Sequence, residues 1–79
     1  MRTRVYVSLK KGLADPQGQT IKQALNDIGF GEIKEVRVGK FLDISIDAKP
    51  DEAVAILREI SEKVLANPVI EDFSIGEQE

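Results

Sequence analysis

The sequence predicts an α+β domain whose elements follow the order strand, helix, strand, strand, helix, strand. The helices are indicated by apolar residues that recur at intervals of three and four over residues 16–28 and 50–65. Two stretches of strand are indicated by alternation of apolar and polar residues over residues 2–9 and 33–47, and a final strand is expected over residues 69–75, after the stop signal at Asn67 and Pro68. This order is typical of a ferredoxin-like fold, a four-stranded antiparallel sheet with both helices on one face.

The first strand and first helix have clear signals. Alternation over residues 2–9 places Thr3, Val5, Val7 and Leu9 on one face, as expected for a half-buried strand. Asp15 can cap the free amides of a helix that starts at Pro16, where no amide donor is needed. The helix should end at Gly29 in a left-handed conformation. We expect its buried face to carry Ile21, Ala24, Leu25 and Ile28.

Residues 33–47 read as two strands of a hairpin interrupted near Gly39 and Lys40. A two-residue turn would place the apolar residues of the two strands on opposite faces. A three-residue loop over residues 39–41, or a bulge at Gly39, brings both sets to one core. The three-residue loop pairs Val38 with Leu42 and leaves Phe41 near the exposed tip of the hairpin.

The second helix should start at Pro50, with acidic residues in its first turn, and stop at Asn67 and Pro68. Its expected inward face includes Ala53, Leu57, Ile60 and Val64. The last strand follows over residues 69–75, and residues 77–79 are expected to fray.

Composition limits the classes of function. With 79 residues, the chain is predicted to form one domain over residues 1–79. A formal net charge of −3 argues against binding to nucleic acid or to an anionic membrane surface. No apolar run approaches the ~20 residues that span a bilayer and the start lacks a signal-peptide core, so we expect a cytoplasmic protein.

The chain contains no cysteine and no histidine. Thiolate nucleophiles, zinc thiolate sites and the usual proton shuttle at neutral pH are therefore absent. The acids Asp43, Asp47, Asp51 and Glu52 are better explained by a solvated strand face and a helix start than by a metal site. We predict no catalytic, cofactor-binding or metal-binding residue in this chain.

Association is predicted instead. The two helices cover one sheet face, and the other face carries Arg4, Tyr6, Arg37 and Phe41. A small sheet also has two edge strands with unpaired amides and carbonyls. We expect the sheet to be extended or packed by dimerisation.

Two local patterns have more than one explanation. Lys10 and Lys11 precede a helix start whose amides could hold an anion, although capping by Asp15 alone accounts for the pattern. Arg37, Gly39 and Lys40 next to Phe41 suit a charge-assisted contact with a partner, and a plain solvated hairpin explains them equally well.

Three segments together resemble the PurS family, the small subunit of phosphoribosylformylglycinamidine synthase. They are KKGLADPQG at residues 10–18, VRVGK at 36–40 and LANPVIEDF at 65–73. The resemblance covers nearly the whole chain. It implies a non-catalytic PurS homodimer, or a tetramer, that bridges a glutaminase subunit and a large synthetase subunit and helps to shield ammonia between them. It also implies that the complex, not this chain, uses ATP with magnesium and glutamine.

The resemblance further implies contact residues for partner chains. They are Asp15, Pro16, Gln17 and Gly18 at the first helix, Arg37, Gly39, Lys40 and Phe41 at the predicted hairpin, and Asn67, Pro68 and Glu71 after the second helix.

Two other functions compete with that of a bridging subunit. One is a free-standing regulatory module that binds a small ligand at a dimer interface, and the other is a small hydrolase of acylphosphatase type, which needs an anion loop with an arginine and an asparagine.

Overall fold

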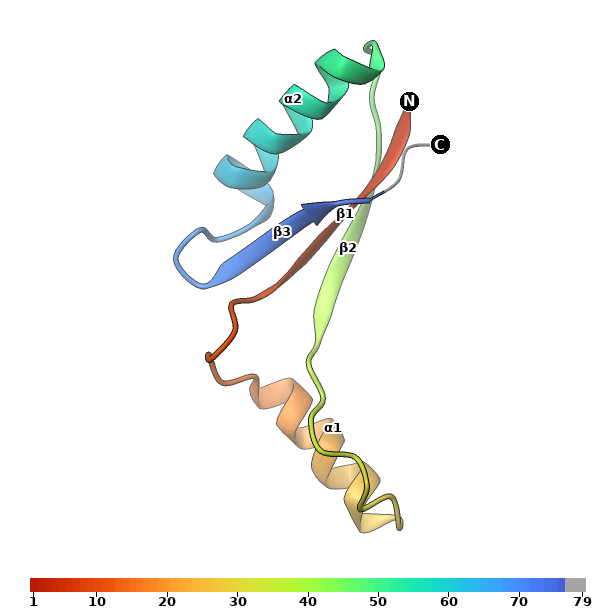
Figure 1. The fold of residues 1–79 in the computed structure, drawn as a ribbon, viewed down its shortest axis with the longest axis vertical. Helices are drawn as coiled ribbons and strands as arrows, with labels where there is room; N and C mark the ends of the chain where they lie inside the picture. The colour runs from red at the N-terminus through yellow and green to blue at the C-terminus, as the bar shows by residue number, and fades with distance from the viewer. Residues whose placement is uncertain (77–79) are drawn as a thin grey trace.

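The computed structural model describes residues 1–76, and the predicted fraying of residues 77–79 lies outside the described residues. The elements are β1 (Arg2–Leu9), α1 (Pro16–Asp27), β2 (Gly39–Ser45), α2 (Pro50–Ile60), a π-helical turn (Ser61–Leu65) and β3 (Glu71–Ile75). The strands form an antiparallel sheet in the order β2-β1-β3 (Figure 1). The α+β class is confirmed, while the described residues contribute three strands to the sheet where four were predicted.

The core lies between α2 and one face of the sheet. Val5 and Leu57 are fully buried, and Val7 and Ala66 join them in one apolar cluster. Pairing of Thr3 with Ile44 and of Val5 with Leu42 and Ile75 brings all three strands' apolar residues to this face. The predicted inward face of β1 is therefore confirmed.

The predicted hairpin over residues 33–47 is wrong. Gly39 and Lys40 do not form a turn: they are the first two residues of β2 and lie opposite Ser8 and Val7 of β1. Phe41 consequently lies within the strand, opposite Tyr6, and not at a loop tip. Residues 33–38 form no strand because their polar groups bind elsewhere: the Val38 amide donates to Asp15 at 2.7 Å.

The position predicted for the first helix is also wrong. α1 starts at Pro16 and Gly29 has φ +109°, both as predicted, but the helix extends away from the sheet beyond the end of β1 (Figure 1). Ile28 is 70% exposed, and Gly18 is the only buried residue of α1. The radius of gyration is 15.9 Å, whereas a compact chain of this length has about 12 Å. Of the two α-helices in the described residues, α2 alone covers the sheet.

The π-helical turn corrects the predicted inward face of the second helix. Ala53 and Leu57 are buried as predicted, but Val64 is 77% exposed. Ser61 follows Leu57 by four residues and so shares its inward face. The π turn that begins at Ser61 holds more residues than an α turn, so it turns Val64 outward and brings Ala66 to the core.

Candidate interaction surfaces

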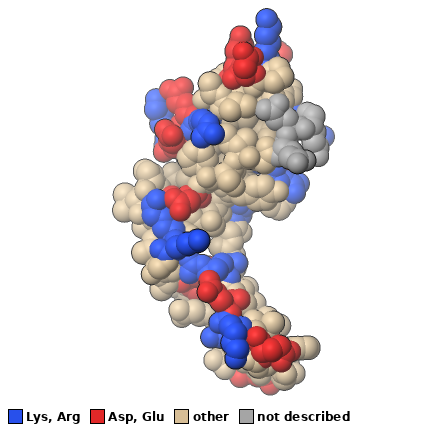
Figure 2. Space-filling view, in the orientation of Figure 1, with Lys and Arg blue, Asp and Glu red and all other residues tan. Residues whose placement is uncertain are grey.

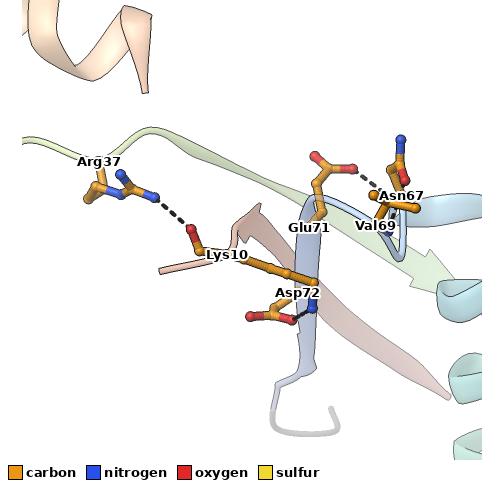
Figure 3. Close-up of polar contacts among 6 residues, drawn as sticks. All are labelled: Lys10, Arg37, Asn67, Val69, Glu71 and Asp72. Atoms are coloured by element: carbon orange, nitrogen blue, oxygen red, sulfur yellow. Dashed lines mark hydrogen bonds and ion pairs between the residues drawn. The ribbon is translucent and has the colours of Figure 1, made fainter. Parts of the chain in front are cut away.

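Lys10, directly after β1, is the point where three parts of the chain meet (Figure 3). Its amide donates to the Ile70 carbonyl at 2.9 Å, and its ammonium pairs with Asp72 of β3 at 2.7 Å. Its carbonyl accepts a hydrogen bond from Arg37 at 3.2 Å. The segments 10–18, 36–40 and 65–73 are thus joined at one end of the sheet.

Asp15 fastens the start of α1 to the segment before β2. One carboxylate oxygen accepts from the Gly18 amide at 2.9 Å, which is the predicted cap, and the other accepts from the Val38 amide at 2.7 Å. The hydrogen bond from Val38, followed by that from Gly18, lowers the pKa of Asp15 below its usual range. Asp15 is 5% exposed, so its role is internal.

Arg37 and Gly18 also hold together the loop over residues 10–15, the first turn of α1 and residues 36–38, which we call the junction. The Arg37 guanidinium donates to the Leu13 carbonyl at 2.7 Å as well as to Lys10. A Cβ added to Gly18 would lie 2.0 Å from the Val36 carbonyl oxygen, so only glycine lets the helix approach this backbone. The loop over residues 10–15, the first turn of α1 and residues 36–38 therefore form one braced unit.

The turn before β3 is closed by its own side chains. The backbone amide of Asn67 donates to the Glu71 carboxylate at 2.8 Å, and the side-chain oxygen of Asn67 accepts from the backbone amide of Val69 at 3.0 Å (Figure 3). Pro68 and Val69 are held on the surface by this arrangement, with Val69 77% exposed. The turn presents a fixed apolar tip to solvent.

The uncovered face of the sheet has its own cluster. Arg4 forms two hydrogen bonds with Asp43, at 2.8 and 3.2 Å, and its guanidinium carbon lies 4.0 Å from the centroid of the Phe41 ring. The hydrogen bond from Arg4 lowers the pKa of Asp43. Tyr6 and Phe41 are 46% and 54% exposed. Arg37, predicted on this face, lies instead at the junction.

The residues proposed for partner contact fall into three places. The junction contains Asp15, Pro16, Gln17, Gly18 and Arg37, strand β2 contains Gly39, Lys40 and Phe41, and the turn before β3 contains Asn67, Pro68 and Glu71. Asp15 and Gly18 are buried, while Pro16, Gln17, Lys40, Phe41, Asn67 and Pro68 are exposed. Sequence reasoning missed the pairing of Lys10 with Asp72, because Lys10 follows the first predicted strand and Asp72 lies in the middle of the last one, and the sequence does not show that the two strands are neighbours.

The described residues offer no catalytic arrangement. Within residues 1–76, no group of three acidic side chains could hold a metal ion. Arg37 is bound to backbone carbonyls and Asn67 to its own turn, so the two do not form the anion loop that an acylphosphatase requires. No helix in the described part is long and apolar enough to cross a membrane.

A small α+β chain with braced surface turns and an uncovered helix has the character of a subunit that binds other chains. The chain matches the family described as PurS, phosphoribosylformylglycinamidine (FGAM) synthase, over residues 2–79. It is 39% identical over 72 residues to the PurS subunit of phosphoribosylformylglycinamidine synthase from Bacillus subtilis, covering 91% of this chain and 86% of that protein.

Solved structures agree. PurS from Methanocaldococcus jannaschii, one of the subunits of formylglycinamide ribonucleotide amidotransferase in the purine biosynthetic pathway, has a TM-score of 0.84 at 40% identity, over 94% of this chain and 90% of that one. PurLQS from Thermotoga maritima contains a chain with a TM-score of 0.84 at 26% identity, over 99% of each. The chain belongs to the PurS family.

Proposed function

We propose that this chain is the non-catalytic subunit of an FGAM synthase, bridging the glutaminase and the ATP-dependent synthetase and helping ammonia to pass between them. The observation that carries the proposal is the likeness to a chain of PurLQS over 99% of both chains. The absence of cysteine and histidine agrees with it, because glutaminase chemistry uses a thiolate nucleophile. In this proposal ATP with magnesium and glutamine are bound by the other chains, and the complex is cytoplasmic.

Reconstitution tests the bridging role. Glutamine-dependent FGAM formation should require this chain together with the glutaminase and the synthetase. Formation from added ammonium salt should need the synthetase alone, because free ammonia bypasses the transfer. Equal glutamine-dependent activity with and without this chain would exclude the proposal.

Dimerisation is part of the proposed function. Among residues 1–76, the apolar stripe of α1 (Ile21, Ala24, Ile28) is left exposed, from 38% at Ile21 to 70% at Ile28, and Ile56 on the flank of α2 is 40% exposed. A ferredoxin-like layer needs a second helix beside α2, and α1 of a second copy supplies one. The reciprocal packing gives a homodimer with two-fold symmetry, and pairing of two such dimers gives a tetramer.

Sedimentation equilibrium measures the assembly. The expected mass is twice 8.7 kDa, or four times that value, at micromolar concentration. A mass of 8.7 kDa under the same conditions would contradict the dimer. The bridging role and the dimer are tested separately, because a monomer could still be required in the reconstitution.

A further inference from the structure

A cleft with a basic lining lies beside the junction. It has a volume of about 660 Å³ and is bordered by the loop over residues 11–15, by α1 and by residues 34–37. Its cationic side chains are Lys11, Lys22, Lys34 and Arg37, and its carboxylates are Asp15 and Glu35. Figure 2 shows lysine and arginine gathered where β1 ends and α1 begins. We call this feature the basic cleft.

The lysines of the cleft have little to neutralise them. Both oxygens of Asp15 are used by the amides of Gly18 and Val38. Glu35 is 4.0 Å from Arg37 and its side chain is 75% exposed. Among the described residues, the three lysines form no ion pair. A positive surface thus persists in a chain whose formal net charge is −3.

The spacing of the charges matches an extended chain better than a single phosphate. The four cations come from three segments of the chain: Lys11 from the loop before α1, Lys22 from α1, and Lys34 and Arg37 from the segment before β2. A cleft of about 660 Å³ is also larger than a single phosphate needs, whereas an extended peptide with several carboxylates can reach cations on all three segments. The braces made by Asp15 and Arg37 fix the walls of the cleft before a ligand binds.

The cleft also stays accessible in the proposed dimer. At about 100° per residue, Gln19, which lines the cleft, lies about 200° around α1 from Ile21 of the apolar stripe. Burial of the stripe against a second copy leaves the Gln19 side of the helix facing outward.

We propose that the basic cleft is the docking groove for an acidic extended segment of one of the catalytic chains. This inference rests on the proposed function, since it names the surface by which the bridging subunit holds a partner. The partner is identified by its chemistry: consecutive or alternate Asp and Glu residues in an extended loop or tail.

Charge reversal in the full complex tests the inference. The variant K11E/K22E/K34E should bind its catalytic partner roughly ten- to a hundredfold more weakly at low salt, because three ion pairs become repulsive. The matched control R2E/K49E/K63E makes the same change in net charge at exposed sites outside the cleft and should bind within about twofold of the natural chain. Affinity is measured by calorimetry for each catalytic chain at two salt concentrations.

Two further measurements decide the remaining outcomes. If the reversal variant melts early, K11Q/K22Q/K34Q replaces it, with an expected loss of about tenfold. Inorganic phosphate and pyrophosphate are also titrated into the natural chain. If either anion saturates the chain below about 1 mM and K11Q/K22Q/K34Q no longer binds it, the cleft is a site for a small anion and the inference is overturned. Equal binding by natural chain and cleft variants, or equal losses in cleft and control variants, would also overturn it. If the natural chain binds neither catalytic chain, the proposed function fails first.

Discussion

The half made of the sheet and α2 and the half made of α1 and residues 30–38 are held together by different forces. In the first half, Val5 and Leu57 are fully buried and the strands pair through their backbones. In the second half, Ile28 is 70% exposed, and the chain is held by Asp15 and Arg37. One half builds its own core, whereas the other is held by hydrogen bonds and leaves apolar side chains exposed on α1, where the proposed dimer would bury them. A subunit that works by assembly can use both arrangements.

The largest expected effect is in the core. Leu57→Ala should lower the free energy of unfolding by about 2–5 kcal/mol, because it leaves a cavity at a position with no exposure. The free energy of unfolding of a chain of this size is only about 4–12 kcal/mol, so the substitution removes a large share of it. Urea denaturation measures the change. Leu13→Ala, at a leucine that is 38% exposed beside the junction, is the control and should cost about 1 kcal/mol or less. If both substitutions lowered the free energy of unfolding by the same amount, the core would not be concentrated in the first half.

Gly18→Ala should have the next largest effect. The new Cβ would lie 2.0 Å from the Val36 oxygen, so α1 and residues 36–38 must separate. The clash outweighs the gain of about 1 kcal/mol in helix propensity, and we expect a net loss of roughly 2 kcal/mol. Hydrogen exchange should locate the loss in α1 and leave the sheet protected. Gly31→Ala, with nothing within 4 Å of the added carbon, is the control. A stabilised Gly18→Ala chain would show that the close approach does not occur in solution.

A smaller effect is expected at the tip of the apolar stripe. Ile28→Ser should weaken the dimer about tenfold, because each copy buries one fewer large apolar side chain. Sedimentation equilibrium across concentrations gives the dissociation constant. Val69→Ser, at a valine that is 77% exposed and away from α1, should leave the dimer unchanged. The reverse ranking of these two variants would place the self-association surface at the turn before β3.

Local features were predicted correctly in both halves, whereas the packing of the second half was not, and the reason is physical. Alternation in β1, in the first half, and Asp15 at the start of α1, in the second half, are local signals, and both were correct. Val36 and Val38 also alternate with exposed residues, but alternation shows only that one face is covered and not what covers it. Here α1 and its loop take the place of a neighbouring strand. Side-chain bonds to distant carbonyls, such as those of Arg37, leave no periodic trace in a sequence.

The smallest expected effect is the pH dependence that Asp15 gives to the second half. The pKa of Asp15 is lower in the folded chain than the value of about 4 expected when it is unfolded. Its stabilisation is therefore complete above about pH 4 and is lost as the pH falls from there through the folded pKa. Asp15→Asn can accept only one of the two amide hydrogen bonds at full strength, so near pH 7 it should melt on the order of 5 °C lower than the natural chain. That difference should shrink toward pH 3 as the natural carboxyl becomes protonated. Asp47→Asn, at an exposed acid, is the control and should melt with the natural chain near pH 7. A gap between Asp15→Asn and the natural chain that stays constant from pH 7 to pH 3 would mean that the charge of Asp15 contributes nothing to bracing the second half, and that only the shape of its side chain does.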